Sequence, residues 1–146
     1  MNKKTLNFNK QLLMGEIGAA TCAPLVSYIF SLFTQKPNII SASAVGGAIF
    51  GASFFWLATR IHDKKKEKTF SASSLASDIA YFTPAAFLLT LLLYYPTLYL
   101  LSHYLLLQGD KVLLSVIPSQ IIAFLLFLIG INLYRLFLFR FSGKKL

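Results

Sequence analysis

Residues 12–25 read LLMGEIGAATCAPL, an apolar stretch rich in small residues that contains one acid, Glu16. Between Lys10 and Lys36 no other charge occurs, so the segment is long enough to cross the hydrocarbon core of a bilayer as a helix. A carboxylate inside such a span is costly and therefore marks a candidate functional position. Residues 75–88 read LASDIAYFTPAAFL and place Asp78 in the same way. These stretches predict membrane-spanning helices in which each acid either pairs with another polar group or takes up a proton, because an isolated charge would be costly.

The composition predicts a membrane protein over the whole chain. Of the 146 residues, 56% are hydrophobic and only 13% are charged, which is more apolar side chain than a soluble domain of this size could bury. We expect an all-α fold with four transmembrane helices, forming one domain over residues 1–146. Pro84 and Pro96 fall within the third helix, which we expect to be tilted or kinked. The predicted spans cover about residues 12–33, 39–59, 75–107 and 112–139.

The lysines and arginines are distributed unevenly between the two sides of the membrane. Twelve of the fourteen precede the first span, lie between the second and third, or close the fourth, whereas Lys36 and Lys111 fall in the other loops. The positive-inside rule places both termini and the middle segment in the cytoplasm, so we expect the cytoplasmic (inner) membrane as the location. Basic residues in these places contact anionic membrane lipids, and the pattern argues against nucleic acid as a partner.

Small residues recur every four positions in the first two spans. This spacing lets two membrane helices approach closely. We interpret it as packing of the two spans into a hairpin. The alternatives are a thin wall beside a substrate path and a contact between subunits of a homodimer. The residues are Gly15, Ala19, Ala23 and Ser27 in the first span, and Ser43, Gly47 and Gly51 in the second.

The two acids belong to a longer repeated pattern. Glu16 is followed by Ile17 and Thr21, and the same acid, Ile and Thr spacing recurs from Asp78 to Thr83. One match of this kind could be chance in an apolar sequence. The spans that follow strengthen it, because each ends in an aromatic segment with an arginine.

Those arginines are Arg60 in FFWLATRI and Arg135 in INLYRLF. Each half of the chain therefore reads as a helical hairpin with an acid near its cytoplasmic start and an arginine at its cytoplasmic end. We expect the halves, residues 1–68 and 69–146, to be related by an axis along the membrane normal. Internal repeats of this kind are common in transporters.

The repeat suggests partners for the charges. Acids and arginines at one depth can pair across helices, so we expect Glu16 to lie near Arg60 or Arg135, and Asp78 near the other. Asp78 has a second interpretation, because an acid in the first turn of a helix is stabilised by the helix dipole. Glu16 has no such alternative, and a protonatable carboxylate facing a bundle interior is a candidate for proton coupling.

The remaining polar residues give weaker signals. Gln120 and Asn132 lie in the fourth span, where amides join helices or line a path. Tyr94 and Tyr95 lie too deep for the aromatic belt and could line a cavity. The sequence shows no nucleophile with a base, no phosphate loop and no metal-ligand or cofactor motif, so we expect neither an enzyme nor a bound metal or cofactor.

Two segments carry a resemblance to a known family. LASDIAYFT at residues 75–83 resembles the start of the third helix in the small four-span L-alanine exporters, which read close to L-A-D-I-L-A-Y-V-T. LYRLF at residues 133–137 is similar to their aromatic-arginine ending, and RIHD at residues 60–63 to their Y-R-D. That family also carries an acid near the start of its first span, where Glu16 lies here. The resemblance implies export of a small amino acid driven by the proton gradient.

The outline is also similar to the four-span proteins that assist lipid-linked sugar transfer, which have aromatic-arginine endings on spans two and four. That resemblance implies a helper or flippase for polyprenyl-phosphate-linked sugars, with Arg60 and Arg135 near the phosphate. A non-transporting accessory subunit of a membrane complex is the third alternative, and its polar residues should be fully paired. We therefore expect a small transporter with a polar path for a small-molecule substrate. We expect it to function as a homodimer, because four helices alone are few to enclose such a path.

Overall fold

The computed structural model describes residues 3–66, 71 and 88–142, and all of its regular elements in these ranges are helices. Four of the helical segments are long and apolar enough to cross a membrane, which makes the chain an all-α, four-helix membrane protein. The elements are α1 (Lys3–Ser31), α2 (Pro37–Lys66), η1 (Thr90–Tyr94), α4 (Tyr95–Leu107) and α5 (Val112–Ser142). The short π-helix η1 continues into α4, and together they form the span Thr90–Leu107.

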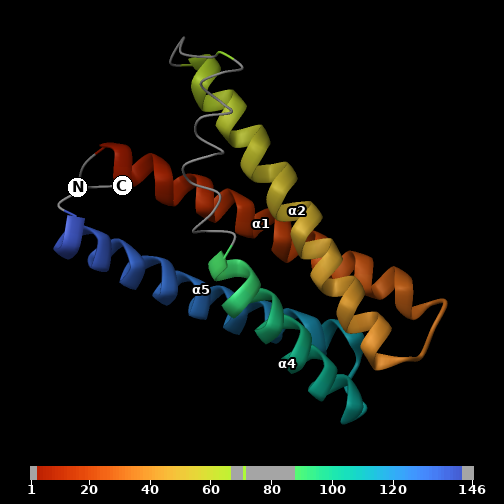
Figure 1. The fold of residues 1–146 in the computed structure, drawn as a ribbon. Helices are drawn as coiled ribbons and strands as arrows, with labels where there is room; N and C mark the ends of the chain where they lie inside the picture. Colours follow the sequence, from red (N-terminus) through yellow and green to blue (C-terminus); the bar gives the residue numbers. More distant parts are fainter. Residues whose placement is uncertain (1–2, 67–70, 72–87, 143–146) are drawn as a thin grey trace.

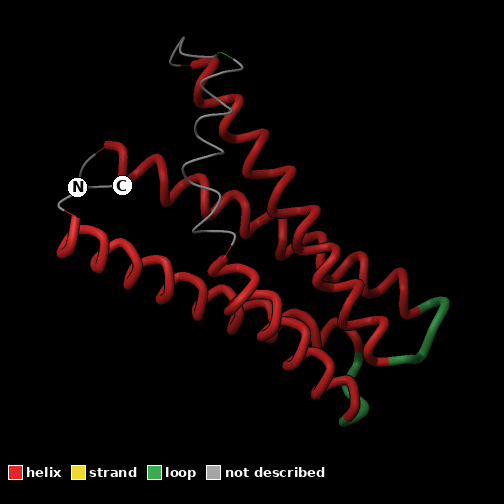
Figure 2. The backbone as a smooth tube through the Cα atoms, in the orientation of Figure 1, coloured by secondary structure: helices red, strands yellow, loops and turns green. Residues whose placement is uncertain are grey.

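The helices form two antiparallel hairpins that point the same way (Figure 1). A short connection joins α1 to α2, and another joins α4 to α5, where Gly109 adopts a φ of 90° that favours glycine. Both connections lie at one end of the bundle, which we call the loop end (Figure 2). The start of α1 and the end of α5 lie at the other end, which we call the terminal end. This arrangement fits the predicted topology, in which both hairpins start and finish on one side.

The four long helices pack as a ring. Helix α1 contacts α2 and α5 extensively, and α4 likewise contacts α2 and α5. The buried centre combines small residues from the first hairpin with larger ones from the second. Close packing of this kind is expected in a membrane, because lipid tails are as apolar as the side chains and helices associate mainly through van der Waals contact. Its apolar members are Ala19, Ala23, Ala44, Ala48, Tyr94, Leu98, Val116, Ala123 and Phe127.

Most span boundaries lie close to the predicted ones, and α1 and α2 are the exceptions. Helix α1 begins at Lys3 rather than near residue 12. We expected the second span to end near residue 59 and a polar loop to follow, but the helix continues to Lys66. The segment RIHDKKK contains no glycine or proline, and lysines in a last helical turn are stabilised by the helix dipole. An ion pair of 2.9 Å between Lys10 of α1 and Asp63 of α2 joins the two helices beyond the predicted span. The part of the third span from 75 to 87 lies outside the described residues.

Close backbone contact holds α1 against α2. A Cβ atom on Gly47 would lie 2.6 Å from the carbonyl oxygen of Cys22, so only glycine fits there. Gly18 and Gly51 face each other so closely that a Cβ on either would clash with the backbone of the other. Gly15, Ala19, Ala23 and Ser27 lie on this buried side of α1. The small residues therefore serve the packing of the first hairpin.

Candidate functional site

A cluster of three polar side chains lies where α1, η1 and α5 meet. Glu16 comes from α1, Tyr94 from the last position of η1, and Gln120 from α5. The Tyr94 hydroxyl lies 3.2 Å from one Glu16 carboxylate oxygen, and the Gln120 amide nitrogen lies 3.2 Å from the other. Residues about eighty and one hundred positions from Glu16 thus reach the same carboxylate.

The hydrogen bonds run in one direction around this cluster. Tyr94 donates its hydroxyl proton to Glu16, and the Gln120 amide donates both to Glu16 and to the Tyr94 oxygen. An ionised carboxylate only accepts hydrogen bonds, so this pattern suits the charged form of Glu16. Both donors are neutral, so they solvate the carboxylate without cancelling its charge.

The cluster contains an unsatisfied acceptor. Tyr94 is 4% exposed and Gln120 is 2% exposed, so both are buried inside the bundle. The Gln120 side-chain oxygen has no hydrogen-bond partner, although its amide nitrogen has two. Leaving a buried acceptor unpaired costs about 1–3 kcal/mol, which a purely structural cluster would be expected to avoid.

The π-helix places Tyr94 in this cluster. The backbone N–H of Tyr95 donates to the carbonyl of Thr90, five residues earlier, rather than to the residue four earlier. Pro96 follows and has no N–H to offer, so the helix is locally widened just before it. The Tyr94 ring then packs edge-on against Phe127 of α5, with ring centres 6.3 Å apart. Single π-helical turns of this kind are frequent at functional sites.

Arg60, one of the two predicted partners of Glu16, lies elsewhere, and the side chain of the other, Arg135, is outside the described part of the structure. The Arg60 guanidinium donates to the side-chain oxygen of Gln11 at 3.3 Å. The register of the hairpin explains the difference, because Gly15 of α1 lies beside Trp56 of α2. Arg60 is one helical turn, about 6 Å, beyond Trp56 toward the terminal end, so it lies level with Gln11 rather than with Glu16.

The other predicted site residues are not brought to the cluster. Thr21 is exposed on α1 and donates to the carbonyls of Ile17 and Gly18 in its own helix. Asn132 is exposed on α5 and donates to the carbonyl of Leu128, four residues earlier.

Three further site predictions cannot be placed side chain by side chain. Arg135 lies in α5, but its side chain is outside the described part of the structure, as are Asp78 and Thr83 altogether. The pairing of Asp78 and the duplication of the two halves therefore stay predictions. Sequence reasoning named Glu16 and Gln120 as site candidates and Tyr94 as a cavity candidate, but it did not bring the three together.

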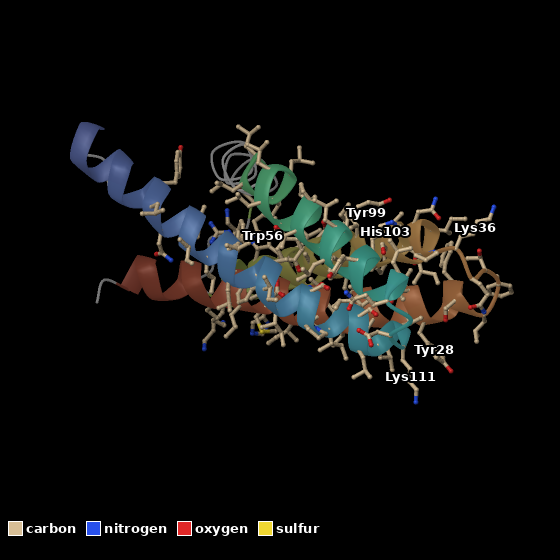
Figure 3. The ribbon with its side chains drawn as sticks, turned by 90° about the horizontal axis from the view of Figure 1, so that it is seen from below. Tyr28, Lys36, Trp56, Tyr99, His103 and Lys111 are labelled. Carbon is tan, nitrogen blue, oxygen red and sulfur yellow. The ribbon has the colours of Figure 1, made fainter. Side chains whose placement is uncertain are left out.

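Nearer the loop end, α4 carries a second polar feature. The rings of Tyr99 and His103 stack with centres 5.8 Å apart, on the side of the bundle where Lys36 also lies (Figure 3). The buried Nδ1 atom of His103 has no hydrogen-bond partner. No group of three metal-ligating side chains occurs among residues 3–66, 71 and 88–142, so the described site is one of hydrogen bonds and a carboxylate.

Fold and site together define an integral membrane protein with four transmembrane helices and an acid held inside the bundle by neutral donors. No family model, curated protein or solved structure matches the chain.

Proposed function

We propose that the protein is a small transporter that exports a small polar metabolite, such as an amino acid, with proton coupling through Glu16. The observation that carries the proposal is the contact of one membrane-embedded carboxylate with Tyr94 and Gln120 alone among the described hydrogen bonds. An acid so placed changes its hydrogen bonding when it takes up a proton, because the protonated form becomes a donor. Such a group can couple proton movement to a change in helix packing.

The unpaired Gln120 oxygen supports transport over a structural role. An accessory subunit has no need for a buried acceptor without a donor, and its polar residues should be fully paired. The same oxygen lies on the side chain that holds Glu16, so a transported solute with N–H or O–H donors would find two kinds of acceptor together. We take this pair of acceptors as the place where the solute binds.

Neutralisation of two acids tests the proposal. The substrate is identified first, by comparing the metabolites exported by cells with and without the protein. Glu16→Gln keeps the size and hydrogen bonding of the side chain but removes its ionisation, so proton-coupled export should be lost. Asp63→Asn is the matched control, because Asp63 lies at the terminal end in an ion pair with Lys10, away from the cluster. Export by the Asp63 variant should match the wild type, and normal export by Glu16→Gln would reject the proposal.

Handling of polyprenyl-phosphate-linked sugars is the second candidate function, and the position of Arg60 supports it. Arg60 lies near the terminal end, level with Gln11 and a turn away from the cluster, where a lipid phosphate would be in reach. The two functions predict opposite sensitivities. A sugar-lipid helper should lose activity in Arg60→Ala and keep it in Glu16→Gln, whereas a proton-coupled exporter should lose it in Glu16→Gln.

A further inference from the structure

The unsatisfied polar atoms of the described residues gather in one half of the bundle. Three buried side-chain atoms lack a hydrogen-bond partner, namely Ser41 Oγ, His103 Nδ1 and Gln120 Oε1. Ser41 and His103 each lie four residues from the loop end of their helix, and Gln120 lies eight residues from it. Each of these atoms has the capacity to hold a water molecule, and together they extend from the loop end to the Glu16 cluster.

Buried serines occupy the same half. Each of the four long helices contributes one fully buried serine within about one and a half turns of the loop end. A fifth, Ser119, is also fully buried and lies one turn further in on α5, directly before Gln120. The four residues near the loop end are Ser27, Ser41, Ser102 and Ser115.

The serine oxygens remain available as acceptors. Ser27, Ser102 and Ser115 donate to carbonyls of their own helices at 3.0–3.2 Å, and Ser119 does so at 2.6 Å. A hydroxyl that donates in this way still has lone pairs free to accept from water. Small residues alone would serve close packing equally well. The buried Ser41 hydroxyl and Gln120 oxygen, which have no partner, distinguish this half from a packing seam.

We propose that these residues form a proton pathway from the loop end to Glu16, carried by water between the serine oxygens and Gln120. The pathway rests on the proposed function and adds to it the side from which protons arrive. The positive-inside prediction places the loop end outside, so protons enter from the exterior. The route is built for protons and not for the solute, since the fully buried Val116 lies at the depth of the serines and the fully buried Leu98 near the depth of Gln120.

The proton balance of the pathway is simple. A proton leaves water at the loop end, moves along hydrogen-bonded water by exchange, and ends on a carboxylate oxygen of Glu16. Each water along the way gains one O–H bond and loses another, so the net change is one proton moved from hydronium to Glu16, whose charge is neutralised. Rotation of the Gln120 amide then turns its unpaired oxygen toward the new O–H group. The same side chain thereby holds Glu16 in both protonation states.

Thiol labelling tests the pathway without any transport measurement. In a Cys22→Ala background, Ser41→Cys and Ser119→Cys place thiols on the route. Ala48→Cys and Ala123→Cys are the controls, because both alanines are fully buried, lie on the same helix faces and are further from the loop end. Silver ion, a thiol reagent small enough to follow a file of water molecules, is added outside sealed right-side-out vesicles. Only the thiolate reacts, and a thiol in contact with water ionises more readily than one in an apolar environment. A cysteine at 119 should therefore react at least about tenfold faster than one at 123.

Equal protection at positions 119 and 123 would overturn the pathway, as would labelling at 119 from the cytoplasmic side alone. Labelling after denaturation in detergent shows that every thiol is present. The outcome is separable from that of the export assay. Fast labelling at 119 with normal export by Glu16→Gln keeps the pathway and rejects coupling through Glu16. Protection at 119 with export lost in Glu16→Gln rejects the pathway and keeps the coupling.

Discussion

Tyr94 joins the members of the buried cluster through one oxygen atom. Its hydroxyl donates to Glu16 and accepts from Gln120, so both neighbours depend on it. Removing that oxygen leaves the half-buried carboxylate with one donor fewer. At the residue scale, the Tyr94 hydroxyl therefore contributes to stability through its two hydrogen bonds, in addition to the apolar area that the ring buries.

Tyr94→Phe should lower the free energy of unfolding by about 1–3 kcal/mol, because a half-buried carboxylate loses a donor and a buried amide loses an acceptor. Tyr104→Phe is the matched control, since Tyr104 lies on α4 and is 57% exposed. That change should stay within about 0.5 kcal/mol of the wild type. Unfolding of both variants in detergent, followed by circular dichroism, gives the comparison. Equal stability of the two variants would mean that the cluster does not hold the bundle together.

At the scale of helices, the first hairpin depends on glycines, whose lack of a side chain lets α1 and α2 approach closely. Gly47 touches the backbone of Cys22 and Ala23, while its neighbour Gly46 has open space where a Cβ would lie. The two glycines are adjacent in sequence and have the same helical conformation. Alanine substitutions at the two positions therefore change helix propensity equally, and the difference between them reports the effect of close packing.

Gly47→Ala should therefore destabilise the hairpin by about 1–3 kcal/mol, because the added methyl group must push α1 away from α2. Gly46→Ala adds the same methyl group toward the surrounding lipid and should change stability by no more than about 0.5 kcal/mol. Denaturation in mixed detergent micelles measures the difference. Similar losses in both variants would show that the α1–α2 contact is looser than the structure indicates.

The sequence predicted the helices well because apolar length and proline or polar breaks decide where a span begins and ends. Of the two arginines predicted as possible partners of Glu16, Arg60 lies one turn away, because charge patterns do not give the register between α1 and α2. That register follows from where Gly18 and Gly51 meet, and the offset amounts to one turn at Arg60. The π-helix that presents Tyr94 was also beyond sequence reasoning. Pro96 signals a distortion, but not which way the preceding turn rotates.

At the scale of the whole molecule, the two hairpins have the same direction and their connections share one end. The arrangement fixes which residues lie on a common side, and the distribution of lysine and arginine predicts which side that is. Lys36 and Lys111 lie in the two connections, whereas Lys65 lies in the last turn of α2 at the other end of that helix. All three side chains are exposed.

Cysteines at these positions, in a Cys22→Ala background, should label from opposite sides of the membrane. An impermeant maleimide added to intact cells should react at positions 36 and 111, because the positive-inside rule places the connections outside. Position 65 should react only after the membrane is opened. Phe50→Cys is the control for lipid burial, since Phe50 is 67% exposed in mid-helix and should react in neither condition. Labelling at 65 in intact cells would invert the topology, and protons would then reach Glu16 from the cytoplasm rather than from outside.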